Sequence, residues 1–135
     1  MNKPSFIPSD KHDMKACSIL SETTDEEVEP HLHELLEWLQ DSNWPVAAHV
    51  INRLQRTGSE LAPAIIEVLK GEDQTWKYYL LSGLMLRCKP LVRELCMNEV
   101  VRIINSPSIE EKFEEVDLVA GEVLVMYKNE PNDKF

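Results

Sequence analysis

Apolar residues recur along this chain at the 3.6-residue spacing of amphipathic helices, in six or seven successive stretches. The clearest stretch places four leucines at i, i+3, i+4 and i+7, namely Leu32, Leu35, Leu36 and Leu39. The first three predicted helices cover about residues 10–20, 30–40 and 45–57, and a fourth ends at about residue 70. The last three cover about 75–88, about 90–105 and a stretch that begins at residue 108. No segment alternates apolar and polar residues between hairpin turns, so the pattern predicts an all-α fold without a sheet.

Capping and breaking residues predict where several of these helices begin and end. Ser9 or Asp10 is expected to cap the first helix. Gly58 is expected to end the third helix in a left-handed conformation. Residues 21–29 are predicted to be a loop or a single turn, because Pro30 interrupts any helix that begins before it.

The last helix is predicted to start at a capping box formed by Ser108 and Glu111. A 3.6-residue period then continues through the apolar residues Phe113, Val116, Ala120, Val123, Leu124 and Tyr127. Residues 1–9 contain two prolines and are expected to be an extended lead-in, and residues 130–135 are expected to fray. The whole chain, residues 1–135, is predicted to be one all-helical domain.

A short motif occurs twice in the chain and indicates an internal repeat. Its first copy contains Asp41, Asn43 and Trp44, and its second copy, 32 positions further on, contains Asp73, Thr75 and Trp76. Each copy stands at the start of the second helix of a pair. We therefore expect antiparallel helical hairpins stacked side by side into a superhelix, with the terminal helices as more polar caps.

The net charge of the chain limits the kinds of partner that it is expected to bind. Twenty-four acidic residues against fourteen basic ones give a formal net charge of −10. This argues against nucleic-acid binding, which needs an electropositive surface, and the bases are scattered instead of forming a stripe. The acidic excess either serves solubility alone or fits a basic protein partner.

The cysteines and the apolar stretches indicate the cellular compartment in which the protein is expected. Cys17, Cys88 and Cys96 are an odd number without metal-ligand spacing, and they lie in apolar or helical context. We therefore expect a reducing, cytoplasmic location. The first residues lack the apolar stretch of a signal peptide, and no window approaches the run of about 18 apolar residues that spans a membrane.

Three blocks of the sequence resemble one family. Residues 7–13 read IPSDKHD, residues 35–47 read LLEWLQDSNWPVA and residues 73–78 read DQTWKY. In this order they resemble the opening, the central signature and the third block of a bacterial domain family of about this length whose function is unknown. The resemblance implies a HEAT-like helical-repeat fold, and it brings no activity and no catalytic residues.

The three tryptophans have two interpretations. Trp44 and Trp76 either line a ridge where a partner docks, since tryptophan is frequent among binding hot spots, or wedge between adjacent hairpins and fix their spacing. Trp38 lies off the apolar stripe of its helix, and the same two interpretations apply to it.

Two turn aspartates are the candidate residues for acid–base chemistry. Asp41 and Asp73 are predicted to face a concave groove, with Lys77 and Tyr78 or Tyr79 beside them. Aspartates next to helix starts are more often caps, which stabilise a helix by about 1 kcal/mol. A small enzyme or ligand-binding domain is therefore the alternative function.

No metal or cofactor is predicted. Residues 33–37 begin like the helix of zinc hydrolases, but Glu37 occupies the place of the second histidine that the metal needs, so His33 and Glu37 are expected on an exposed helix face. With four glycines in the chain, no phosphate-binding loop or dinucleotide fingerprint is present.

The sequence favours a non-enzymatic helical-repeat module that binds a protein partner, because stacked hairpins offer an extended surface. An immunity-like protein that blocks a basic toxin is one concrete form. The candidate partner surface consists of Trp38, Asp41, Asn43, Trp44, Asp73, Trp76, Lys77 and Tyr78.

Overall fold

Helices account for all the regular structure in residues 3–130, the part of the chain that the computed structural model describes. The α-helical segments are α1 (Met14–Leu20), α2 (Asp25–Val28), α3 (Leu32–Leu36), α4 (Pro45–Leu54), α5 (Leu61–Leu69), α6 (Gln74–Ser82), α7 (Pro90–Leu95), α8 (Met97–Asn105), α9 (Ile109–Phe113) and α10 (Val116–Lys128). The 3-10 segments are η1 (Glu29–His31), η2 (Glu37–Leu39) and η3 (Leu84–Leu86). The all-α prediction is confirmed for these residues.

Residues 3–130 contain more helical segments than the six or seven predicted, partly because four of the predicted helices are divided, including the one over 30–40, which consists of η1, α3 and η2. The helix predicted over 90–105 is interrupted at Cys96, between α7 and α8. The helix predicted over 75–88 is interrupted at Gly83 and continues as η3. The last predicted helix is interrupted next to Glu115, whose φ of 62° is left-handed and therefore incompatible with a continuous helix.

Gly83 allows α4 and α6 to approach each other closely. A Cβ atom at this position would lie 3.0 Å from the side-chain Cδ1 of Ile51 and 3.0 Å from the carbonyl oxygen of Tyr79. A larger residue would therefore displace the end of the Ile51 side chain or open the last turn of α6.

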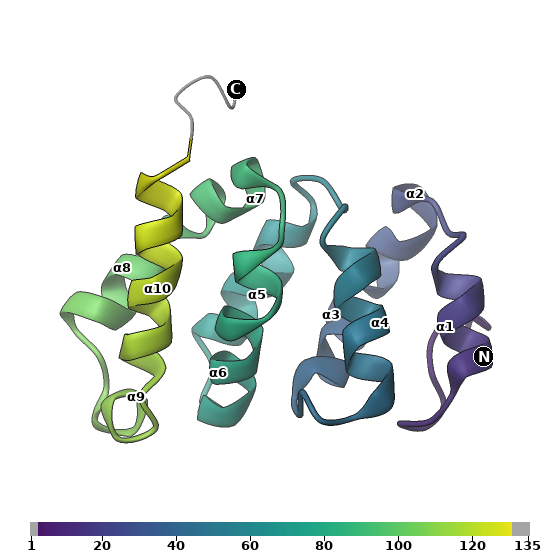
Figure 1. The fold of residues 1–135 in the computed structure, drawn as a ribbon, viewed down its shortest axis with the longest axis horizontal. Coiled ribbons are helices and arrows are strands. Elements are labelled where there is room, and N and C mark those ends of the chain that lie inside the picture. The colour runs from purple at the N-terminus through teal and green to yellow at the C-terminus, as the bar shows by residue number, and fades with distance from the viewer. Residues whose placement is uncertain (1–2, 131–135) are drawn as a thin grey trace.

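The helices lie in two rows along the long axis of the molecule (Figure 1). Contacts join α1 to α4 and α6 to α10 in one row, and they join α3 to α5 and α5 to α8 in the other. The chain passes from one row to the other with almost every connection, so α3, α4, α5 and α6 run alternately down and up in Figure 1. This order brings the turns that precede α4 and α6 to the same edge.

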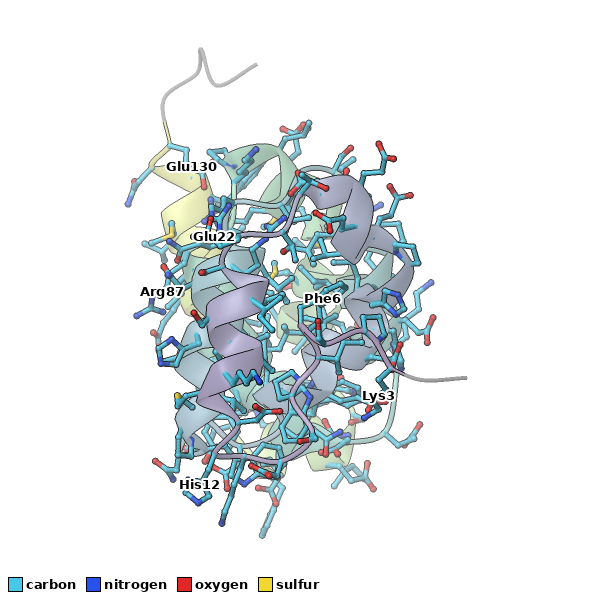
Figure 2. The ribbon with its side chains drawn as sticks, turned by 90° about the vertical axis from the view of Figure 1, so that its right-hand side faces the viewer. Lys3, Phe6, His12, Glu22, Arg87 and Glu130 are labelled. Atoms are coloured by element: carbon cyan, nitrogen blue, oxygen red, sulfur yellow. The ribbon has the colours of Figure 1, made fainter. Side chains whose placement is uncertain are left out.

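A cluster of buried apolar side chains runs through both rows and includes residues that precede the first helix. Phe6 and Ile7 belong to this cluster, and the ring of Phe6 meets the ring of His31 edge-on, with centroids 5.6 Å apart. The amide of Ile7 donates to the carbonyl oxygen of Pro4 at 3.1 Å. Residues 4–7 therefore form a turn packed on the core instead of an extended lead-in; in Figure 2, Phe6 lies in the middle of this end of the molecule.

Arg53 of α4 is buried and ties the segment before α2 to the end of α4. Its guanidinium donates to the hydroxyls of Thr23 and Thr57, both at 3.1 Å, and to the carboxylate of Asp25 at 2.9 Å. The hydrogen bond from Arg53 is the main reason why the pKa of Asp25 lies below its ordinary value. The buried guanidinium is thus satisfied by three partners.

Arg93 of α7 has the same role near the end of α10. This buried side chain donates to the carbonyl oxygens of Met85 and Cys88 at 2.8 and 2.9 Å, and it pairs with the carboxylate of Glu130. Apart from Glu130, the predicted frayed segment 130–135 lies outside the described residues.

Two predicted helix ends differ from the structure. Asp13 caps α1, with its carboxylate accepting from a backbone amide of the first turn, so neither Ser9 nor Asp10 has this role. Gly58 is not left-handed, since no glycine in residues 3–130 has a positive φ. The helix before it stops without the predicted glycine motif, and the chain turns through αR geometry at Gln55.

Two capping boxes are formed. The predicted box of Ser108 and Glu111 is confirmed at the start of α9. A second box, Thr24 with Glu27, begins the single turn α2. Pro30 permits this box because it follows in the 3-10 turn η1, where a proline at the first or second position removes no hydrogen bond.

All three cysteines are buried free thiols. Burial raises the pKa of Cys88 to about 11 and that of Cys96 to about 12, so both are protonated at neutral pH. Among the described helices, none combines the length and the apolar character needed to cross a membrane.

Candidate functional site

Two turns of similar sequence lie at one edge of the molecule, the lower edge in Figure 1, and α9 lies at the same edge. We call residues 41–45, between η2 and α4, the first corner. We call residues 73–77, at the start of α6, the second corner. The predicted partner surface falls entirely on these two corners and on the positions next to them, Trp38 and Tyr78.

At the first corner, Asp41 shapes the turn and does not cap the helix. Its carboxylate accepts from the amide of Asn43 at 2.8 Å, and no side chain caps α4, which begins at Pro45 after Trp44. The rings of Trp38 and Trp44 meet edge-on with centroids 5.7 Å apart. Both tryptophans are partly buried against the core.

At the second corner, Asp73 is a helix cap as the sequence indicated. Its carboxylate accepts from the amide of Trp76 at 3.0 Å, which places Trp76 inside the first turn of α6. The indole N–H of Trp76 donates to the carbonyl oxygen of Leu36 at 2.9 Å, and its ring meets that of His33 edge-on at 5.8 Å. Trp76 therefore wedges α6 against α3.

Lys77 points into the interior and not toward the aspartates. Its ammonium lies 2.8 Å from the carboxylate of Glu111, and these side chains are only 3% and 1% exposed. Arg102 donates to the two oxygens of the same carboxylate at 2.7 and 2.9 Å. Burial alone would raise the pKa of Glu111, but the hydrogen bonds from Arg102 and Lys77 outweigh it and lower the pKa to about 2. The three side chains hold α9 to α6 and α8.

Tyr78 and Tyr79 form an edge-to-face pair with centroids 5.8 Å apart. Both rings are half-buried. They line a hollow of about 250 Å³ whose other lining residues are Gln74, Thr75, Glu114 and Glu115. The aromatic pair therefore borders the same stretch of α6 that faces α9.

Of four hollows on the described surface, the largest, about 710 Å³, lies between the start of α6 and α9. We call it the α6–α9 groove; its lining residues are Glu72, Asp73, Gln74, Thr75, Ile109, Glu110, Phe113 and Glu114. Four of these carry carboxylates and none is basic. Ile109 and Phe113 are 85% and 82% exposed, at i and i+4 on α9.

Phe113 faces the groove because the last predicted helix is divided. The 3.6-residue period had placed Phe113 in one apolar series with Val116. The left-handed Glu115 changes the direction of the chain between them, so Val116 is buried while Phe113 is exposed. Of the residues that line the groove, the predicted surface included only Asp73, and it omitted both exposed apolar residues, Ile109 and Phe113. One feature of the sequence could have identified these two residues: acidic residues lie on both sides of Phe113, at Glu110–Glu111 and Glu114–Glu115.

The groups proposed for acid–base chemistry do not meet in one site. Asp73 lines the α6–α9 groove, while Lys77 lines a separate hollow of about 220 Å³ and is already paired. Asp41 lines none of the four hollows. Within residues 3–130, no three His, Cys, Asp or Glu side chains are grouped so that they could hold a metal ion.

Comparison with known sequences bears on the family. No curated protein matches this chain. The sequence model of DUF5071, a domain of unknown function, matches residues 6–124, which include both corners, the α6–α9 groove and the Lys77–Glu111 pair. Since the match covers most of the chain, the protein belongs to the DUF5071 family of domains of unknown function.

Proposed function

We propose that this chain is a non-enzymatic, HEAT-like helical-repeat module that binds a protein partner at the α6–α9 groove. The alternation of helices between two rows supports the repeat arrangement, because each added pair buries its apolar face against the one before. Modules of this kind use extended surfaces along one side or edge.

The observation that carries the proposal is the exposure of Ile109 and Phe113, at 85% and 82%. Single exposed apolar residues are common, but two large ones one helical turn apart beside a hollow of about 710 Å³ form a contiguous patch. Aromatic side chains are enriched among the residues that dominate binding energy. Covering Phe113 alone would stabilise a complex by about 1.5–3 kcal/mol.

The acidic side chains around Ile109 and Phe113 favour a basic partner. Glu72, Asp73, Glu110 and Glu114 line the groove, and the whole chain carries a formal charge of −10. Complementary charge raises the rate of encounter and excludes partners of like charge. An immunity-like protein that neutralises a basic toxin is one form that this surface fits.

The test is affinity capture from native extract with a double variant of the groove. We expect Ile109→Ser with Phe113→Ser to abolish capture of one partner while the helical circular dichroism and the melting temperature stay unchanged, because both side chains are exposed.

Val125→Ser is the matched control, since Val125 is 59% exposed on α10 and lines none of the four hollows. The control is expected to retain the partner. Retention of the same partner by the double variant, or its loss from the control alone, would contradict the proposal.

We also propose that the protein acts in a reducing compartment, the bacterial cytoplasm. The support is that Cys17, Cys88 and Cys96 are free thiols and buried.

A further inference from the structure

Resting on the proposed function, we propose that the α6–α9 groove receives an arginine-bearing basic segment of the partner, whose guanidinium binds Gln74 and whose neighbouring apolar side chain covers Phe113. Three features of the groove point to this occupant: its unpaired carboxylates, an unsatisfied amide oxygen, and the tyrosine pair at its far end.

The carboxylates of the groove are available to a ligand. Glu110 and Glu114 make no side-chain hydrogen bond or ion pair within residues 3–130, and they lie one turn apart beside Ile109 and Phe113. The nearest cation of α9, Lys112, does not line the groove and lies 3.8 Å from Asp117. A cation that pairs with these carboxylates is therefore supplied by the occupant and not by a lining residue of the groove.

Gln74 identifies the kind of donor. Its side-chain N–H donates to the carbonyl oxygen of Glu72 at 3.2 Å, which fixes the orientation of the amide. The amide oxygen Oε1 is then buried without a hydrogen-bond partner. A buried acceptor left without a hydrogen bond destabilises the folded chain. Because this oxygen exposes less than 1 Å² of surface, an incoming N–H donor reaches it only after the Gln74 side chain turns toward the groove or toward the hollow beside the tyrosines, both of which Gln74 lines.

Arginine fits this place better than lysine does. A guanidinium presents five N–H groups in a planar fork, so it can donate to Gln74 Oε1 and to the carboxylate of Glu114 at the same time. Its flat face also packs on aromatic rings, and Tyr78 and Tyr79 border the adjoining hollow together with Glu115. Lysine provides the charge without the planar fork.

The apolar part of the occupant follows from Ile109 and Phe113. Side chains at i and i+4 on a helix are neighbours about 5–6 Å apart, so one large apolar side chain can cover both. Nucleic acid is disfavoured by the carboxylates. A second copy of this acidic chain would bring like charges together, and it is an outcome that the test separates.

The experiment measures binding of a fluorescent ten-residue peptide in which two arginines flank a leucine, by fluorescence anisotropy. Three peptides of the same length replace both arginines by lysine, by citrulline or by glutamate. We expect the arginine peptide to bind at least about tenfold more tightly than the citrulline and glutamate peptides, and several-fold more tightly than the lysine peptide.

Two changes in the protein test where the peptide binds. Glu110→Gln with Glu114→Gln should weaken binding of the arginine peptide at least about tenfold, and Gln74→Leu should remove its advantage over the lysine peptide. Glu122→Gln, an exposed acid of α10 outside the groove, is the control and should change the affinity less than about twofold.

Four results would overturn the inference: no binding of the arginine peptide up to about 1 mM, equal binding of the citrulline peptide, no effect of the double glutamine variant, or a dimer in sedimentation velocity that Phe113→Ser dissociates. The double variant Ile109→Ser with Phe113→Ser can lose the partner while the double variant Glu110→Gln with Glu114→Gln retains it. That result would overturn this inference and leave the proposed function standing. Retention of the partner by all these variants would contradict the proposed function itself.

Discussion

The two corners share an aspartate and a tryptophan at the same spacing, yet they are built differently. Asp73 caps its helix and places Trp76 in the first helical turn. Asp41 bonds within the turn, and Trp44 precedes a helix that begins at Pro45. The expectation of two equivalent copies is therefore wrong in its detail, although both corners begin a helix of the same row.

The difference shows that the helix start, and not the spacing of the motif, decides what a tryptophan contacts. Trp44 lies outside its helix and meets Trp38, whereas Trp76 lies inside its helix and reaches Leu36. Both tryptophans thus pack on the continuous segment of α3 and η2. Their structural interpretation accounts for these contacts without a partner.

The corners also differ in what lies against them. The amide of Val46, just after the first corner, donates to the carbonyl oxygen of Lys11 at 3.2 Å, so the segment before α1 packs there. Beside the second corner lies the open α6–α9 groove. A hollow of about 410 Å³ also reaches the first corner at Ser42, but none of its lining residues is a large exposed apolar side chain. The α6–α9 groove, and not the tryptophan motif, is therefore the better candidate for binding.

Breaking the buried ion pair of the second corner should have the largest effect on stability. Glu111→Gln removes the charge that Lys77 and Arg102 share, leaving a buried ammonium without its counterion. We expect a loss of about 3–5 kcal/mol in the free energy of unfolding, measured by urea denaturation. The neighbouring change Glu110→Gln should cost less than about 0.5 kcal/mol, and equal losses would contradict this account.

Acid should weaken the second corner through the same carboxylate. The folded pKa of Glu111, about 2, lies below its ordinary value of 4.5, so the carboxylate stabilises the fold fully above pH 4.5. Its contribution is lost as the pH falls from there toward 2. The difference in unfolding free energy between wild type and Glu111→Gln should therefore shrink between about pH 4.5 and pH 2. A constant difference would show that the charge of Glu111 is not responsible.

The tryptophans should respond differently to loss of the indole N–H. Trp76→Phe leaves the carbonyl oxygen of Leu36 without this donor, and we expect it to cost about 1–2 kcal/mol. Trp44→Phe keeps an aromatic ring beside Trp38 and should cost less than about 1 kcal/mol. Thermal unfolding of both variants measures the order, and the reverse order would show that the corners are not distinguished in this way.

The smallest expected difference concerns the two aspartates. Asp73→Ala removes a helix cap and should cost about 1 kcal/mol. Asp41→Ala removes only a bond within a turn, so we expect less than half of that loss. Chemical denaturation of the two variants side by side gives the comparison, and similar losses would restore the equivalence of the corners.

Local signals made much of the fold predictable. The apolar spacing located the helices, and the cap at Asp73 and the box of Ser108 and Glu111 followed from short-range hydrogen-bonding chemistry. The Lys77–Glu111 pair joins residues 34 positions apart, and no local pattern specifies such a contact. Glu111 was recognised only as a capping residue for this reason.

Only part of the candidate site could be predicted from the sequence, and the reason differs from the one given for the Lys77–Glu111 pair. The second corner was identified from its motif, but Phe113 was assigned to the helix that continues through Val116. Its distance of three residues from Val116 fits a continuous helix. Only the left-handed conformation of Glu115 separates the two, and a non-glycine residue in that conformation leaves no clear trace in the sequence.

Photo-crosslinking in living cells tests most directly whether the α6–α9 groove is the binding site. A photoreactive benzoylphenylalanine would replace Phe113 in one protein and the exposed Asn43 of the first corner in another. We predict a crosslinked protein partner from position 113 and none from position 43. A partner crosslinked from position 43 but not from position 113 would place the binding surface at the first corner and contradict the account.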